Sequence, residues 1–195
     1  MKNYFTSLVA ILLLFVLACS SQTDEFTDLF VRVAKMKMNR NDYTLGETLT
    51  DKQKDTAQRN AVDAASSGTY KFKDEDLFIV ADKATDRVLI LYEQYDPATQ
   101  DKVRELVGNL FFDFGDPTVM AHDKTIYWAF DENGKISEEQ YRDAKEKGEP
   151  LKTLATVKLD SSHKIMGDNR DVRNGSVYYI VSSEPLLKMI EKRPQ

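Results

Sequence analysis

The sequence predicts an α+β fold, in which an antiparallel sheet of about six strands in hairpin pairs carries helices on one face and follows N-terminal helices. Two observations support this prediction. Segments rich in β-forming residues come in pairs, and helical patterns stand between the pairs. The regular alternation of single strands and helices that is typical of parallel sheets does not occur in the sequence.

Two helices are expected before the sheet. Thr23 can cap the first helix, and the apolar side chains after it recur at helical spacing, namely Phe26, Leu29, Phe30 and Val33. Thr50 and Gln53 have the spacing of a capping box, which predicts a second helix over residues 51–66. The polar stretch 39–49 between the two helices predicts a loop.

Paired segments of β-forming residues define the expected sheet. These strands are 77–81 with 88–92, 118–121 with 125–130, and 154–159 with 177–181. The second pair turns at His122, a residue type that tolerates unusual backbone angles. Ile126, Trp128 and Phe130 alternate along one side of the next strand, which predicts that this side is buried.

Three further helices are expected between and after these strands. Asp96 as cap and Pro97 as first residue begin the strongest of them, and Gly115 ends it. Its apolar side chains are Val103, Leu106, Val107, Leu110, Phe111 and Phe114. Serines with capping spacing predict two shorter helices within 137–148 and 183–190.

The N-terminus and the charge balance limit the functions open to this chain. The apolar run 8–17 is too short to span a bilayer, which needs about 20 helical residues, and it predicts a secretory signal peptide over residues 1–18. Removing it leaves 195 − 18 = 177 residues, the size of one domain. Only Lys2 of the 27 basic residues is lost, so 26 basic residues against 32 acidic ones give a net charge of −6. We therefore expect no binding to nucleic acid.

The end of the apolar run carries the clearest motif. Val16-Leu17-Ala18-Cys19 resembles a bacterial lipobox, which implies cleavage before Cys19 and acylation of this residue as a membrane anchor. Several acyl chains give lasting anchorage, because each buried methylene contributes about 0.8 kcal/mol. Ser20 and Ser21 follow in place of the aspartate that retains lipoproteins at the inner membrane of enteric-type bacteria, which implies the outer membrane. The expected organisation is a signal peptide (1–18), a lipid-anchored N-terminal helical segment and loop (19–68), and an α+β domain (69–195).

Two groups of residues are candidates for binding. A long polar stretch between the last two strands offers ligands for a cation or a carbohydrate at Asp168, Asn169, Arg170 and Asp171. Tyr127 alternates with Trp128, and Tyr178 alternates with Tyr179, so both tyrosines are expected on the sheet face away from the helices. Tyrosines exposed there would suit a protein or glycan contact, unless further chain covers them.

The sequence predicts no catalytic residue, no metal site and no cofactor. The stretch 131–141 fits the second half of a calcium loop, but Ala129 and Gln140 stand where two of its acidic ligands belong. His122 and His163 leave a hydrolase open as an alternative, although no Gly-x-Ser-x-Gly nucleophile elbow occurs.

One segment resembles a known family. Residues 100–131 combine an apolar helix, the run Phe114-Gly115-Asp116-Pro117-Thr118, and a hairpin that carries Tyr127 and Trp128. This order resembles the helix, Gly-x-Pro and aromatic-strand unit of small outer-membrane lipoproteins of the SmpA/OmlA type, which support assembly of outer-membrane β-barrels. The resemblance implies a non-catalytic interaction module.

These observations favour an outer-membrane-anchored, periplasm-facing lipoprotein that acts as a non-catalytic adaptor or envelope-assembly factor. Its expected partners are the membrane, through acylated Cys19, and an envelope protein. A ligand-binding lipoprotein is the first alternative, and a hydrolase is the second.

Overall fold

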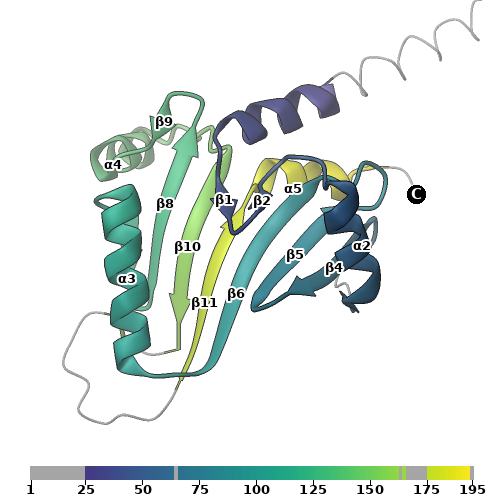
Figure 1. Ribbon diagram of the computed structural model, residues 1–195. Helices are drawn as coiled ribbons and strands as arrows, with labels where there is room; N and C mark the ends of the chain where they lie inside the picture. The colour runs from purple at the N-terminus through teal and green to yellow at the C-terminus, as the bar shows by residue number, and fades with distance from the viewer. Residues whose placement is uncertain (1–24, 64–65, 163, 166–174, 194–195) are drawn as a thin grey trace, which may run out of the picture.

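The computed structural model describes residues 25–63, 66–162, 164–165 and 175–193, and it confirms the α+β prediction (Figure 1). Its large sheet consists of β3 (Ala61–Val62), β4 (Thr69–Asp74), β5 (Leu77–Asp82), β6 (Val88–Ala98), β7 (Val119–Ala121), β8 (Thr125–Asp131), β9 (Gly134–Lys135), β10 (Ala155–Ser161) and β11 (Gly175–Ser182). The strand order is β3-β4-β5-β6-β11-β10-β8-β7, with β9 paired to β8. All these pairs are antiparallel.

The sheet has nine strands, three more than the hairpin pairs predicted. Two of the additional strands, β3 and β9, are two residues long, too short to show a periodicity of two. The third, β4, alternates Tyr70 and Phe72 with Lys71 and Lys73, and it pairs along its whole length with β5.

The helices are residues 25–35, α2 (Asp51–Arg59), α3 (Gln100–Phe114), α4 (Glu138–Lys147) and α5 (Glu184–Glu191). Three of the predicted caps are confirmed. Capping boxes form at Thr50 with Gln53 and at Ser137 with Gln140, and the Ser183 hydroxyl accepts a hydrogen bond from the Leu186 amide. The serine and threonine hydroxyls thus satisfy backbone amides that a helix start leaves unpaired.

Two predicted helix boundaries were wrong. The second helix ends at Arg59 and not near residue 66, because the Asn60 side chain donates to the carbonyl of Lys73 and the chain enters β3. The helix expected from Pro97 begins only at Gln100, with Thr99 as its cap, because β6 continues to Ala98, which pairs with Gly175 of β11. Pairing with the neighbouring strand therefore overrode the local helix signal.

The stretch expected to be a loop over residues 39–49 contains a small hairpin of its own. Strands β1 (Asn39–Arg40) and β2 (Tyr43–Thr44) pair with each other around a turn at Asn41, whose φ is 50°. Tyr43 and Leu45 are buried. The hairpin is therefore part of the packed structure.

One face of the sheet carries the hydrophobic core. Helix α3 packs on β8, where the ring of Phe111 meets that of Trp128 at 5.8 Å and Phe114 contacts Phe130 at the same distance. Phe30 of the helix over residues 25–35 belongs to the same buried cluster as Leu91 and Trp128. The boundary expected at residue 68 therefore falls inside one core, to which both sides contribute.

None of the described helices is long and apolar enough to cross a bilayer. The predicted signal peptide and Cys19 lie outside the described residues.

Candidate functional site

The two predicted tyrosines lie on the same face of the sheet, opposite the face that carries α3. Tyr127 of β8 pairs with Lys158 of β10, and Tyr178 of β11 pairs with Asp160, which also belongs to β10. Both tyrosines are half-buried. The other predicted binding residues, Asp168, Asn169, Arg170 and Asp171, lie outside the described residues.

Cross-strand pairing extends Tyr127 into a continuous row, which we call the open-face row. Successive pairs in the strand register join its members Phe78, Tyr92, Ile180, Lys158 and Tyr127. Each of the five side chains keeps intermediate exposure. Because neighbouring strands lie about 4.8 Å apart, the row is roughly 20 Å long.

Two of the three rings in this row are packed against each other. Phe78 and Tyr92 are stacked with ring centroids 4.8 Å apart, and the ammonium group of Lys73 lies 5.3 Å from the Phe78 centroid. Since β4 and β6 flank β5, both faces of the Phe78 ring are occupied. Nucleobases and similar flat ligands bind aromatic side chains through their faces. The row instead offers ring edges and hydroxyl groups, which suit contact with a protein surface.

Polar groups complete this surface. Lys158 Nζ lies 2.8 Å from Asp160, which also accepts a hydrogen bond from Thr125. Burial raises the pKa of Asp160, but the bonds from Lys158 and Thr125 outweigh burial and hold it below its ordinary value. At the end of the row, burial and a hydrogen bond with Tyr141 of α4 raise the pKa of Tyr127. The tyrosine therefore stays uncharged.

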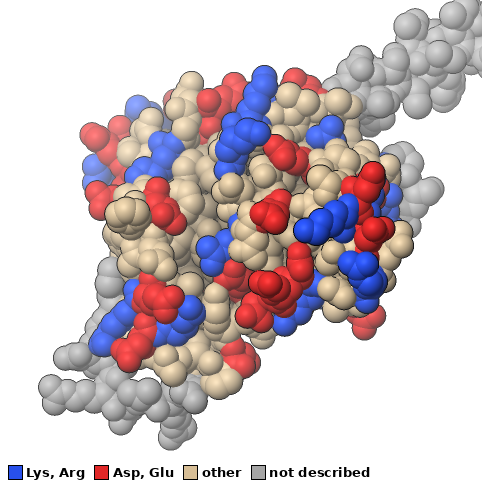
Figure 2. Space-filling view, in the orientation of Figure 1, with Lys and Arg blue, Asp and Glu red and all other residues tan. Residues whose placement is uncertain are grey.

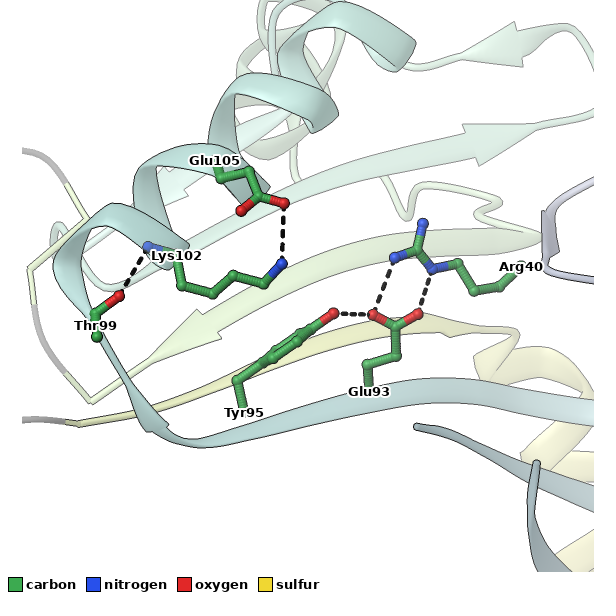
Figure 3. A network of polar contacts seen from close by, with 6 residues as sticks. All are labelled: Arg40, Glu93, Tyr95, Thr99, Lys102 and Glu105. Carbon is green, nitrogen blue, oxygen red and sulfur yellow. Dashed lines mark hydrogen bonds and ion pairs between the residues drawn. The ribbon is translucent and has the colours of Figure 1, made fainter. Parts of the chain in front are cut away.

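A second polar cluster, on the face that carries α3, contains residues that the sequence analysis missed (Figure 3). Glu93 of β6 is 5% exposed and accepts two hydrogen bonds from Arg40 of β1, at 2.5 and 2.9 Å. The Tyr95 hydroxyl donates a hydrogen bond to the same carboxylate. The Arg40 guanidinium also lies 4.8 Å from the centroid of the Tyr179 ring.

The electrostatics of this cluster indicate a structural role. Burial raises the pKa of Glu93, but hydrogen bonds from Arg40 and Tyr95 more than offset this and hold it below the ordinary value. Burial and the same bond raise the pKa of Tyr95 to about 12. The carboxylate is therefore ionised and already held by donors, so it is unsuited to act as a base. No local motif signals the pair, because its members are 53 positions apart.

The turn at His122 is brought close to the segment after β10. The amide of Ser161 donates to the carbonyl of Lys124, and that of Ile165 donates to the carbonyl of Asp123. His122 has a φ of 53°, as expected for a turn residue. Ser161 is 5% exposed, which limits access of a substrate to its hydroxyl. His163 lies outside the described residues.

The segment that partly fits a calcium loop forms a tight hairpin. Asp131 accepts a hydrogen bond from the Asn133 amide, and β9 pairs back onto β8 directly after Gly134. Its sequence neighbours therefore continue strands and not the entering helix of a calcium loop. Within the described ranges, no group of three or more His, Cys, Asp or Glu side chains is placed to hold a metal ion.

A groove of about 550 Å³ lies between the helix over residues 25–35 and the β8–β9 turn. Its apolar lining is Met36, Met38, Phe130 and Leu154. Arg32 forms an ion pair with Glu132 of the turn, while its Nε is buried without a hydrogen-bond partner among the described residues. The volume is in the range of small-molecule sites.

Comparisons of the chain with protein-family models, with curated proteins and with solved structures gave no match.

In the view of Figure 2, acidic and basic side chains intermix without a large area of one charge. The features of the chain that bear on function are therefore the motif at Cys19 and the open-face row.

Proposed function

We propose that the protein is a lipoprotein anchored in the outer membrane through acylated Cys19, and that its α+β domain is a non-catalytic adaptor for another envelope protein. The open-face row carries the adaptor part of the proposal. It joins aromatic, aliphatic and lysine side chains across five neighbouring strands, and each of them remains partly exposed. Tyrosine is enriched at protein interfaces, because its ring packs while its hydroxyl bonds.

Two sequence features support the envelope location. The lipobox-like run that ends at Cys19 follows an apolar stretch of signal-peptide length. The resemblance of residues 100–131 to SmpA/OmlA-type lipoproteins supports a role in envelope assembly. We therefore favour as partner a protein that takes part in assembling the outer membrane.

Anchoring is tested by Cys19→Ser. The wild-type chain should fractionate with the outer membrane, and metabolic labelling with a fatty acid should mark it. The variant should lose the label and leave the membrane fraction or remain unprocessed. A variant that is still processed and membrane-bound would contradict the lipoprotein part of the proposal.

The adaptor role is tested by purifying the tagged, lipidated protein in mild detergent and quantifying the envelope proteins that co-elute. Tyr178→Ala and Lys158→Glu alter the open face without removing a buried side chain. Both should reduce a stoichiometric partner strongly. Val31→Ser changes a side chain of 39% exposure on the helix over residues 25–35 and serves as the control. Equal recovery of the partner from all three variants, or no partner with the wild type, would refute the adaptor role.

The groove beside Arg32 favours ligand binding as a second candidate function. A small molecule that saturates the site at about 100 times its Kd should add about 2.7 kcal/mol to the free energy of unfolding. A thermal-shift screen measures this gain. Met36→Glu, in the groove, should abolish the shift, whereas Tyr178→Ala should preserve it. The reverse pattern would place a ligand on the open face.

A further inference from the structure

The groove between the helix over residues 25–35 and the β8–β9 turn has a buried apolar lining. Met38, Phe130 and Leu154 are at most 9% exposed, and Met36, of intermediate exposure, also lines the groove. Methionine side chains are unbranched and polarisable, so they adapt to an irregular apolar ligand. The volume of about 550 Å³ falls in the range of small-molecule sites. The lining therefore suits a flexible apolar chain.

The rim of this groove carries more positive than negative charge. Its charged side chains are those of Arg32, Lys35 and Lys135 against those of Asp131 and Glu132, and all five are more exposed than the buried lining. The Lys135 ammonium donates to two backbone carbonyls at the end of α3, and neither lysine has a carboxylate partner in the part of the chain that the structure describes. Because the whole chain has a net charge of −5, this positive excess is local. It should attract a negatively charged head group.

Arg32 has a replaceable partner and an unused donor. Its guanidinium pairs with Glu132, whose side chain belongs to the opposite side of the groove and is 60% exposed. An ion pair with so exposed a member contributes little to stability, so another anion can replace Glu132 at small cost. The Nε of Arg32 is buried and donates to no described residue. Since buried polar groups are normally paired, the guanidinium retains the capacity for a further acceptor oxygen.

We propose that the groove binds a single-chain amphiphile with a carboxylate head group, which is a fatty acid. The inference rests on ligand binding at the groove, the second candidate function proposed above, and adds the chemical class of the ligand. The acyl chain lies against the apolar lining. The carboxylate lies at the rim by Arg32 and Lys35, which are three positions apart and therefore neighbours on one helix face. There it takes the place of Glu132.

The charges of the rim select among head groups. Arg32 already pairs with a carboxylate, that of Glu132, which favours a carboxylate over the larger phosphate. A cationic amphiphile would meet three positive side chains, and a neutral one would gain nothing from them. The ranking of head groups on one and the same chain is therefore the property to measure.

Isothermal titration calorimetry with amphiphiles that share a ten-carbon chain tests this ranking. Every residue of the described core lies between Phe30 and Ile190, so a chain of residues 20–195 retains this core. Below their critical micelle concentrations, decanoate should bind at least about 10-fold more tightly than decyl maltoside or decyltrimethylammonium, because charged groups form the stronger hydrogen bonds. Decyl phosphate should bind more weakly than decanoate, and tighter binding of the phosphate would overturn the carboxylate assignment.

The length of the chain is tested with octanoate. It lacks two methylenes, each of which contributes about 0.8 kcal/mol when buried, so it should bind up to about 15-fold more weakly than decanoate. Met36→Glu places a charge in the apolar lining and should abolish the binding of both. Equal affinities of octanoate and decanoate would show that the chain is not buried, and would overturn the proposal.

Lys35→Gln tests the rim and should weaken the binding of decanoate about 3-fold, as expected for an exposed ion pair. The binding of decyl maltoside should not change, so a merely structural effect is recognised. Lys52→Gln, at an exposed position of α2, makes the same change of charge outside the groove and is the matched control. Equal effects of the two substitutions would contradict a head group at the rim.

Glu132→Gln should increase the affinity, because it removes the carboxylate that competes for Arg32. Decanoate should bind at least about 3-fold more tightly to this variant, and decyl maltoside should bind as before. Glu184→Gln is the matched control, since it breaks an ion pair with Lys188 of α5 in which both side chains are exposed. An unchanged or lower affinity of Glu132→Gln for decanoate would overturn the replacement of Glu132 by the ligand.

The outcomes distinguish this inference from ligand binding in general. If all head groups bind equally and Met36→Glu abolishes their binding, the groove is a ligand site but the fatty-acid assignment is wrong. The same conclusion holds if decanoate fails to bind while a compound of another class binds in the groove. If no compound of the thermal-shift screen binds there, both the inference and the second candidate function are refuted.

Photo-cross-linking tests the site in the full chain in membranes. A fatty acid with a diazirine in its chain and a free carboxylate should label peptides that contain Met36 or Leu154, as mapped by mass spectrometry. An excess of decanoate should suppress this label, and Met36→Glu should lose it. Labelling that is spread evenly over the chain and indifferent to Met36→Glu would overturn the proposal.

Discussion

Arg40 and Glu93 join the small β1–β2 hairpin to the centre of the large sheet. The guanidinium donates from Nε to Oε1 and from Nη2 to Oε2, so both carboxylate oxygens are engaged. The Glu93 side chain is 7% exposed and that of Arg40 is 36% exposed. The pair therefore has one buried member, and its loss should cost more than the loss of a surface ion pair.

Arg40→Met should lower the free energy of unfolding by about 2–4 kcal/mol, because it leaves a buried carboxylate without its cation. Urea denaturation at neutral pH measures the change. Lys37→Met is the matched control, since it breaks an ion pair with Glu47 in which both side chains are exposed. The control should cost less than about 1 kcal/mol. Equal losses would show that the Arg40–Glu93 pair contributes no more than a surface pair.

Acid should destabilise the protein through its buried carboxylates. Burial raises the pKa of Glu93 and of Asp82, but hydrogen bonds from Arg40 and Arg193, respectively, leave both folded-state values lowered. The unfolded chain therefore binds protons more readily than the folded one. This stabilisation is complete above the unfolded values of about 4 and is lost as the pH falls below them.

Unfolding free energies measured between about pH 7 and pH 3 should accordingly decline most steeply below about pH 5. Glu93→Gln removes one of the two linked groups, so the variant should be less stable at neutral pH but show a shallower decline. An unchanged pH slope in this variant would contradict the linkage.

Local signals predicted the caps at Thr50, Ser137 and Ser183, because a capping interaction involves residues only three positions apart. The same holds for the placement of Tyr127 and Tyr178, since alternation along one strand decides which face a side chain joins. The neighbours of Tyr127 in the open-face row were not predictable in this way. Phe78 and Tyr92 join the row because β6 pairs with β11, and these strands are separated by more than 70 residues of sequence.

The start of α3 shows that a local helix signal can also be overridden by strand pairing. Pro97 is a favourable first residue of a helix, yet the strand pairing of Ala98 with Gly175 delays the helix to Gln100. The Arg40–Glu93 pair was missed for a related reason. Each residue is an ordinary charged position in its own segment, and only the fold brings them together.

Gly115 should be less tolerant of substitution than Gly148, although both cap helices. Gly115 has φ 66° and ψ −151°, a conformation open almost only to glycine, whereas Gly148 has φ 68° and ψ 23°, in the left-handed helical region. Gly115→Ala should cost about 1–3 kcal/mol, and Gly148→Ala about 1 kcal/mol. The Gly115 carbonyl accepts a hydrogen bond from Trp128, so its substitution should also shift the tryptophan fluorescence. Equal costs would show that the backbone relaxes around residue 115.

The Thr118 hydroxyl should be more sensitive to substitution than the Thr125 hydroxyl. It is fully buried, and its Oγ1 donates to the carbonyl of Ile136 at 2.5 Å and accepts from the amide of Ala129 at 2.9 Å. Thr118→Val preserves the shape of the side chain but leaves two buried backbone groups unpaired. Each such group costs about 1–3 kcal/mol, so the total loss should be about 2–5 kcal/mol.

Two variants isolate this hydroxyl. Thr118→Ser retains it and loses only a methyl group, so its cost should be smaller, about 1 kcal/mol. Thr125→Val removes a half-buried hydroxyl that donates to Asp160, where water can take its place, and should cost about 0.5–1.5 kcal/mol. Urea denaturation of the three variants should therefore rank Thr118→Val as the least stable. If Thr118→Ser proved as costly as Thr118→Val, packing of the methyl group would account for the burial of this residue, and the hydroxyl bridge would not.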